Sequence, residues 1–236
     1  MIPLRKQDDL SDWVKRTFGH VFAQPLLCQT ALTHRSAGAD HNERLEFLGD
    51  AILNCSVARM LYDAQPQADE GALSRLRASL VSGETLAQIA AELGISDHLR
   101  LGPGELKSGG FRRGSILADS LEAMLGAIFL DAGFDAAAAA VARIMTPRLS
   151  ELPSADTLKD PKTRLQEVLQ ARGLALPTYT LTAATGDHHA QVFTVTCEIP
   201  VFGVAAVGEG ASRRRAEQLA AAKVMHLLPS EVRNTV

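Results

Sequence analysis

The chain has 236 residues, 46% hydrophobic and 22% charged, so it can bury a core and is not expected to be disordered. It has no run of 18 uninterrupted apolar residues, and the start MIPLRKQDDL lacks the apolar stretch of a secretory signal, so we expect no membrane span. The net charge of −3, taken alone, argues against a nucleic-acid partner.

The charge is distributed unevenly along the chain. Residues 1–156 hold 15 Lys/Arg and 20 Asp/Glu, which gives −5, whereas residues 157–236 hold 9 and 7, which gives +2. An acidic part is therefore followed by a mildly basic one. Cys28, Cys55 and Cys197 lie far apart and form no CxxC pair, which predicts reduced thiols and a cytoplasmic protein without structural zinc.

Residues 4 to 150 show a helical pattern rich in Ala and Leu, and the alanine run 136–140 is predicted to continue a helix. The glycine-rich segment LGPGELKSGGFRRG (101–114) predicts a loop, and the polar segment SELPSADTLKD (150–160) is typical of a linker. We therefore predict a helical domain over 1–150, a linker over 151–158, a second domain over 159–229 and a C-terminal tail over 230–236.

One group of acidic residues lies in NERLEFLGD (42–50). Glu43, Glu46 and Asp50 fall within an arc of about 60° at 100° per residue. Apolar residues that can be buried lie roughly opposite: Leu45, Leu48 and Ile52. The spacing therefore predicts an acidic stripe along one face of a helix.

A second acidic stripe lies in ILADSLEAMLGAIFL (116–130). Asp119 and Glu122 are three residues apart and are the only charges in this segment. The apolar residues surround them: Leu117, Leu121, Met124 and Ile128 on one face, with Ile116, Leu125, Ala127 and Phe129 on the others. Such a helix is expected to be buried on most sides.

Carboxylates that share a buried site repel one another and lose hydration, at a cost of several kcal/mol per unpaired ion. Protonation, arginine partners or a divalent cation must compensate. An all-carboxylate cluster suits Mg²⁺, which prefers oxygen ligands, and no His/Cys constellation competes for a softer metal. Two carboxylates from each of two helices could hold Mg²⁺ beside a phosphodiester.

Two other interpretations of the acids stay open at this point. A single acidic stripe is most often a solvated helix face. Nearby arginines could also form structural ion pairs with these acids: Arg44, Arg59, Arg75 and Arg77.

The C-terminal part has the pattern of a small mixed domain. DPKTRLQEVLQARG (160–173) is a predicted helix with Asp160 as N-cap, Pro161 in the first turn and Gly173 as the stop. Three predicted strands and a last helix follow: 178–184, 192–199, 201–207, and Ser212 to about Leu228, with a turn at Gly186. The order α-β-β-β-α predicts one sheet with two helices on one face.

These segments resemble the ribonuclease III family. HNERLEFLGDAIL (41–53) resembles its signature, and other family motifs follow in order: ALTHRS (31–36), DEGALSRLRASLVS (69–82), LGPGELKSGG (101–110) and ILADSLEAMLGAIFLD (116–131). The C-terminal part resembles a double-stranded-RNA-binding domain through residues 160–173 and GEGASRRRAEQLAAAKV (208–224). The resemblance covers nearly the whole chain and implies an all-α nuclease domain followed by a small α+β RNA-binding domain.

The resemblance also implies a function. Family members are homodimers with a catalytic valley between protomers, and each Mg²⁺-dependent site, in which Mn²⁺ can substitute, cuts one strand of a duplex. The staggered cuts leave 5′-phosphates, 3′-hydroxyls and short 3′ overhangs. The implied substrates are ribosomal, messenger and transfer RNA precursors.

By the motif match, the metal cluster is Glu46, Asp50, Asp119 and Glu122, with Asp50 and Glu122 as catalytic residues. Glu43 and Glu70 match acids at the dimer junction and the substrate-facing rim. Glu105 matches an acid in the glycine-rich loop that supports the site. None of these acids departs from the family pattern.

The resemblance assigns RNA contacts to two helices and one turn. Minor-groove contacts match Thr163, Gln166, Glu167 and His189, and phosphate contacts match Ser212, Arg213 and Arg214. Cations at a helix N-terminus are unfavourable by about 0.3–1 kcal/mol each, and a bound phosphate would reverse that sign. Such domains recognise the shape of A-form RNA. His188 and His189 as a metal pair is a weaker alternative, because no third ligand lies near in the sequence.

Two rival functions keep the same residues. A non-catalytic RNA-binding regulator would retain the fold but would not need the acids. A structural dimer could use the acidic stripes for ion pairs between protomers and would not depend on metal.

Overall fold

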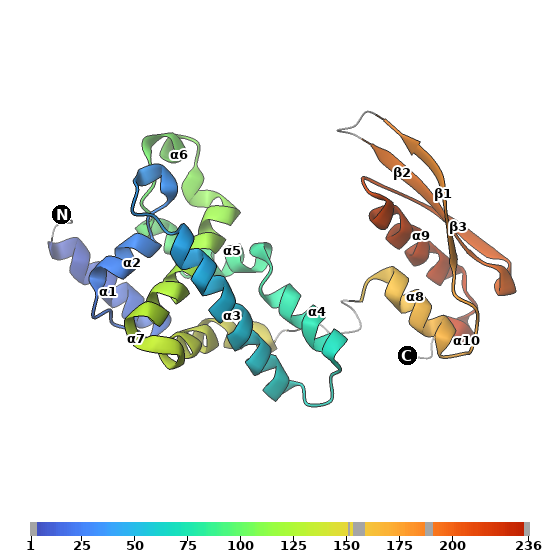
Figure 1. The fold of residues 1–236 in the computed structure, drawn as a ribbon, viewed down its shortest axis with the longest axis horizontal. Helices are drawn as coiled ribbons and strands as arrows, with labels where there is room; N and C mark the ends of the chain where they lie inside the picture. Colours follow the sequence, from blue (N-terminus) through green and yellow to red (C-terminus); the bar gives the residue numbers. More distant parts are fainter. Residues whose placement is uncertain (1–3, 151, 153–158, 187–190, 234–236) are drawn as a thin grey trace. The chain divides into compact units, whose positions relative to one another are not determined.

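The computed structural model describes residues 4–150, 152, 159–186 and 191–233, and the chain divides into two compact units, residues 1–155 and 156–236 (Figure 1). The first unit is helical, as predicted. Its helices are α1 (Leu4–Phe18), α2 (Pro25–Ala31), α3 (Glu43–Ala64), α4 (Glu70–Leu80), α5 (Gly83–Glu92), α6 (Pro103–Lys107) and α7 (Gly114–Ser150).

Helix α7 is the centre of the first unit and packs against α1, α2, α3 and α5. Leu121, Met124 and Ile128 are fully buried along it. By length and hydropathy α7 could also cross a membrane, but its apolar residues are those of a core helix. Gly133 interrupts the helix with φ 82° and ψ −177°, and the alanine run continues as helix beyond this kink.

Helices α3 and α7 touch through their backbones. A Cβ atom on Gly49 would lie 1.8 Å from the carbonyl oxygen of Glu122, and one on Gly126 would lie 2.2 Å from that of Leu45. Any side chain at either position would collide with the neighbouring helix. The two glycines therefore allow the close approach that brings the acidic stripes of the two helices together.

The segment 101–114 is more regular than the loop predicted for it. Pro103 begins the short helix α6, and a 3₁₀ turn follows at Gly110–Arg112. Gly109, with φ 75°, separates the two. The glycines thus mark the ends of short helical turns, while Pro103 occupies the first helical position, where its missing N–H costs nothing.

The second unit has the predicted α-β-β-β-α order. Its elements are α8 (Pro161–Gln170), β1 (Thr178–Thr185), β2 (Val192–Ile199), β3 (Val204–Gly210), α9 (Arg213–Leu227) and α10 (Ser230–Arg233). The strands form one antiparallel sheet in the order β1-β2-β3. Helix α9 packs on β2 and β3, and α8 packs against α9 (Figure 1). Asp160 caps α8 by accepting from the N–H groups of Lys162 and Thr163.

Two details differ from the predicted boundaries. The third strand covers Val204–Gly210 instead of 201–207, because Pro200 begins a 3₁₀ turn that ends at Gly203 with φ 61°. In the predicted tail, residues Ser230–Arg233 form the short helix α10, and Val232 joins the core of the unit. A side chain at Gly208 would meet the backbone of α9, so this glycine permits the contact of β3 with that helix.

Candidate metal centre and nucleic-acid interface

Three carboxylates from two helices meet in the first unit. Glu46 comes from α3, and Asp119 and Glu122 come from α7. One carboxylate oxygen from each lies within 4.8 Å of the others, and all three side chains are half-buried. The cluster exists because the glycine contact between α3 and α7 places the two acidic stripes face to face.

Burial and mutual repulsion raise the pKa values of these acids. The pKa of Glu122 is raised to about 7, chiefly by burial and then by the charges of Asp50, Glu46 and Asp119. Burial also raises the pKa of Glu46, with Asp119, Glu43 and Asp50 adding to the effect. Burial raises the pKa of Asp119 as well, although His34 and Arg35 oppose the rise. The cluster therefore favours a bound proton or cation.

Asp50 lies beside this group rather than inside it. It is exposed, and its Oδ1 accepts a hydrogen bond of 2.7 Å from Nδ2 of Asn54, one turn further along α3. Its charge nonetheless contributes to the raised pKa of Glu122.

A polar cavity of about 430 Å³ opens beside the cluster. Its lining combines acids with basic and neutral side chains: Glu43, Glu46, Glu105 and Asp119, with Arg35 and Arg113, and with His34, Asn42, Ser115 and Ile116. Nη1 of Arg35 donates to Glu43 at 3.2 Å, and Nη1 of Arg113 donates to Glu105 at 3.2 Å. Glu43 and Glu105, the outer acids, thus hold arginines. The inner acids do not: Glu46, Asp119 and Glu122.

The inner acids are not neutralised by arginine. In the described part of the chain, no salt bridge involves Glu46, Asp119 or Glu122. Their ligand atoms are all oxygens, and neither histidine nor cysteine belongs to the group. This donor set fits a hard divalent cation such as Mg²⁺, which keeps part of its water shell and needs an open site.

Glu70 is not brought to this cavity within one protomer. It lies in the first turn of α4, after the C-terminal end of α3, and its Oε1 accepts from the hydroxyl of Ser74 at 2.7 Å. Glu105, by contrast, does line the cavity, from α6. The predicted supporting acids Glu43 and Glu105 therefore share the cluster's surroundings, and Glu70 lies outside them.

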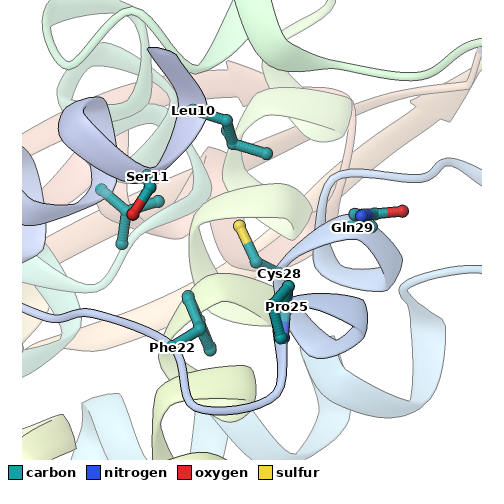
Figure 2. A pocket seen from close by; sticks show the side chains of 7 residues that line it. Leu10, Ser11, Phe22, Pro25, Cys28 and Gln29 are labelled. Carbon is teal, nitrogen blue, oxygen red and sulfur yellow. The ribbon is translucent and has the colours of Figure 1, made fainter. Parts of the chain in front are cut away.

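A second, smaller cavity lies between α1, α2 and the segment that joins them (Figure 2). It holds about 80 Å³ and is lined largely by apolar groups, among them Leu10, Phe22 and Pro25. Burial raises the pKa of the Cys28 thiol to about 12, so the thiol stays protonated and unreactive. Nothing in this cavity resembles a catalytic group.

The predicted RNA contacts of the second unit lie on α8 and α9. Ser212 caps α9, since its hydroxyl oxygen accepts from the N–H of Arg215, and Arg213 and Arg214 are exposed. On α8, Gln166 is exposed, while Thr163 donates to Asp160 at 2.8 Å. The third predicted contact on α8, Glu167, is paired with Lys159 at 2.6 Å. These side chains are thus largely pre-positioned by partners within the unit.

The predicted contact at His189 lies outside the described residues, as does His188. Sequence patterns alone do not single out Lys162 or Glu217, which form an ion pair of 2.6 Å between α8 and α9. These residues are 55 positions apart. Their pairing could have been suspected only from two opposite charges placed near the starts of two helices.

The first unit is thus a helical domain with an acidic cluster whose geometry suits a cation, and the second is a compact domain with arginines at a helix N-terminus. That combination is typical of metal-dependent nucleases that carry a separate nucleic-acid-binding domain. Comparison with known families makes the class more specific. Residues 24–149 match the model described as Ribonuclease-III-like, and residues 161–228 match the double-stranded RNA binding motif.

The chain belongs to the ribonuclease III family, a family of endoribonucleases specific for double-stranded RNA. It is 57% identical over 208 residues to Ribonuclease 3 of Thiobacillus denitrificans, covering 88% of this chain and 92% of the relative. It is 54% identical over 218 residues to Ribonuclease 3 of Nitrosococcus oceani, covering 92% of this chain and 94% of the relative.

Solved structures resemble the first unit. One is the nuclease domain of ribonuclease III from Campylobacter jejuni, with a TM-score of 0.57 and 38% identity over 59% of this chain and 98% of that chain. That structure is described as showing flexibility in a region involved in dimer formation. A second structure of that domain, at 2.2 Å resolution, has a TM-score of 0.57 and 36% identity, and the match covers 65% of this chain and 100% of that chain.

Proposed function

We propose that this chain is a Mg²⁺-dependent endoribonuclease that cuts both strands of double-stranded RNA at staggered positions. The products carry 5′-phosphate and 3′-hydroxyl ends, and Mn²⁺ substitutes for Mg²⁺. The observation that carries the proposal is the half-buried group of Glu46, Asp119 and Glu122, whose raised pKa values favour a compensating cation. Family membership supports the duplex specificity.

The inner acids would hold the ion, with Glu46, Asp119 and Glu122 as ligands and Asp50 turning in from its contact with Asn54. When bound, Mg²⁺ supplies an activated water and offsets negative charge on the phosphate. Glu122 and Asp50 are the residues that we assign to catalysis, because they match the catalytic acids of the family motifs. No serine or cysteine is required as a nucleophile.

The outer acids have a supporting role in this proposal. Glu43 and Glu105 hold Arg35 and Arg113 at the edge of the cavity that contains Glu46 and Asp119. A guanidinium so placed can meet a phosphate with two donors. We assign Glu70 to the dimer junction, since in one protomer it lies away from the cavity.

Cleavage of a duplex across a range of Mg²⁺ concentrations, with mapping of the product ends, tests the proposal. We expect cleavage with Mg²⁺ or Mn²⁺, none with EDTA, and none by Glu122→Gln, which should still bind the duplex. Glu84→Gln is a matched control, because Glu84 is an exposed acid in the first turn of α5. Duplex binding by the wild-type chain without cleavage in any metal would favour the non-catalytic regulator instead.

We also propose that the chain acts as a homodimer. Helix α3 carries large exposed apolar side chains on one side: Phe47 is 81% exposed and Tyr62 is 70% exposed. Single exposed apolar residues are common, but two aromatic ones on the helix that bears the acidic stripe favour burial by a second copy. A dimer would place two metal centres on one duplex, one for each strand.

Cys55 lies between these aromatic residues on α3 and provides the test. It is exposed, whereas Cys28 and Cys197 are buried. In a dimer through α3, a maleimide should label Cys55 slowly, and labelling should become fast in Phe47→Glu, which we expect to be a monomer. Fast labelling of wild-type protein that sediments as a dimer would place the interface elsewhere.

The substrates that we propose are structured precursors of ribosomal, messenger and transfer RNA, processed in the cytoplasm without membrane attachment. The support is the pairing of a duplex-specific nuclease with a separate RNA-binding unit. Depletion of the protein from its native cell, followed by sequencing of RNA 5′-ends, would identify the precursors that accumulate.

A further inference from the structure

A single carboxylate joins the two helices that carry the proposed RNA contacts. Oε2 of Glu217, on α9, lies 2.6 Å from Nζ of Lys162 on α8. Its Oε1 lies 3.0 Å from Nε of Arg213, one turn earlier on α9. The Glu217 side chain is only 13% exposed and that of Lys162 is 35% exposed, whereas the Arg213 side chain is 61% exposed and reaches solvent.

The same contact extends to the sheet. Nζ of Lys162 lies 4.4 Å from the centre of the Tyr179 ring on β1. Lys162 is therefore held between a carboxylate on α9 and an aromatic ring on the sheet, which restricts its side chain on both sides. Glu217 thus links α8, α9 and β1 at one point.

The charge of Arg214 on α9 also acts on Asp160, the N-cap of α8. Burial alone would raise the pKa of Asp160, but hydrogen bonds from Thr163 and Lys162, together with the charge of Arg214, lower it. Arg214 on α9 is therefore close enough to act on the first turn of α8. The residues that we assign to the minor groove and those that we assign to phosphates lie in one electrostatically connected region.

An acid at this place is unexpected if charge alone matters. Duplex RNA is strongly negative, and a carboxylate one helical turn from the phosphate-binding arginines weakens the attraction. Hydrogen bonds from Lys162 and Arg213 lower the pKa of Glu217, so it stays ionised at neutral pH. The contacts of Glu217 with Lys162 and Arg213 must therefore provide a benefit that outweighs the repulsion between its carboxylate and RNA.

We propose that Glu217 is a positioning residue for double-stranded RNA, which holds Arg213 toward a phosphate and fixes the spacing between α8 and α9. It binds Arg213 through Nε, and within the described residues no hydrogen bond is recorded for the two Nη groups, which stay available to a phosphate. A-form RNA presents its minor-groove hydroxyls and its phosphates at a fixed spacing, so two rigidly joined helices fit it better than two independent ones. This inference rests on the proposed function.

Glu217→Gln separates the repulsion of RNA by this carboxylate from the positioning of Arg213, because the two effects change the affinity in opposite directions. Removal of a negative charge alone would tighten binding and steepen its dependence on salt. Loss of positioning should instead weaken duplex binding about tenfold and flatten the salt dependence by about one phosphate contact. The rate of cleavage at saturating RNA should not change, because the metal centre lies in the other unit.

The control is Glu209→Gln. Glu209 is an exposed acid on β3, and it points away from α9 because its neighbours Gly208 and Gly210 are the residues that face that helix. The two variants therefore remove the same charge from opposite faces of one sheet. We expect Glu209→Gln to bind the duplex as well as the wild-type chain or slightly more tightly.

Arg213→Lys gives an independent test that keeps the net charge and alters only an exposed residue. Lysine has a single nitrogen, which cannot pair with Glu217 and also present two further nitrogens to a phosphate, so the inference predicts clearly weaker duplex binding than in the wild-type chain. Wild-type affinity in Arg213→Lys or in folded Glu217→Gln would overturn the inference and leave the proposed function intact. A wild-type chain that does not bind duplex RNA at all would overturn both.

Discussion

Glu122 shows how a single side chain couples the metal centre to stability. Its pKa is about 7 in the folded chain and near the ordinary value of 4.5 in the unfolded chain. The folded state therefore binds the proton more tightly, and folding is weakened as the pH rises from about 4.5 to 7, where the folded group becomes ionised. This direction is opposite to that of a salt-bridged acid.

We expect Glu122→Gln to raise the melting temperature of the metal-free protein above pH 7 and to leave it nearly unchanged near pH 4.5. Addition of Mg²⁺ should stabilise the wild-type chain more than the variant, because the ion replaces the proton at the acids. Thermal melts in EDTA and in Mg²⁺ across this pH range check the prediction. Equal melting temperatures at pH 8 without metal would show that Glu122 is not strained by its neighbours.

Asp131 illustrates the opposite case of a buried and well-satisfied carboxylate. It is 1% exposed and lies 2.8 Å from Nε2 of His20. It also accepts from the N–H groups of Ala23 at 2.9 Å and Gln24 at 2.8 Å. Burial alone would raise the pKa of Asp131, but these hydrogen bonds lower it below its ordinary value. Asp131 thereby ties the segment before α2 to α7.

Asp131→Asn should cost about 3 kcal/mol of unfolding free energy, because its NH₂ group replaces one carboxylate oxygen and faces a backbone donor that is left unpaired. The stability supplied by Asp131 is present above the ordinary aspartate pKa and is lost as the pH falls through the lower folded value. The difference between variant and wild type in urea denaturation should therefore shrink in acid. A constant difference down to pH 2 would contradict this account.

At the scale of elements, the contact between α3 and α7 sets the geometry of the site. Gly49→Ala places a Cβ atom where the backbone of Glu122 already lies. We expect a loss of about 3 kcal/mol or failure to fold, together with loss of cleavage. Gly83→Ala is the matched control, since Gly83 also belongs to a helix but a Cβ atom added there would meet nothing within 4 Å. Denaturation of both variants decides whether crowding is the cause.

The elements also show what a sequence can and cannot predict. The helical and mixed folds could be predicted because their periodicity and caps are local, as at Asp160 and Ser212. The sequence pattern places the third strand three residues too early, because the 3₁₀ turn at Pro200 resembles extended chain. The kink at Gly133 could not be predicted, because one glycine in an alanine-rich helix gives little signal.

The acids of the site could be found because they repeat along one face of each helix, but their relation to one another could not. Periodicity places Asp50 with Glu46, yet only the fold shows that Asp50 contacts Asn54 and stands beside the cluster. Long-range pairs give no local signal at all. His20 and Asp131 are 111 positions apart, and nothing near either residue indicates the other.

At the scale of the whole molecule, the two units divide catalysis from affinity. The proposed metal centre lies in residues 1–155, and the proposed phosphate contacts lie in residues 156–236. A tethered binding unit raises the local concentration of RNA at the nuclease without adding a catalytic group. The net charge of −5 on the first part gives it little affinity for RNA of its own.

Deletion of residues 157–236 should therefore leave a dimer that cuts poorly at physiological salt and retains some activity at low salt, where electrostatic contacts are stronger. Cleavage assays on the full and truncated chains across a series of salt concentrations check this. A truncated dimer that is inert at every salt concentration would mean that the second unit takes part in the reaction itself.

The glycines at positions 49 and 126 have one more consequence, for side-chain length. Because the two helix backbones already touch, α3 and α7 have no room left to move closer. Glu46→Asp or Glu122→Asp would keep the charge yet shorten the arm by one methylene, and the scaffold could not close the gap. We expect either variant to need far more Mg²⁺ for half-maximal cleavage. The side chains of Glu46 and Glu122 fit the distance between α3 and α7, and the contact between the two backbones keeps that distance from shrinking.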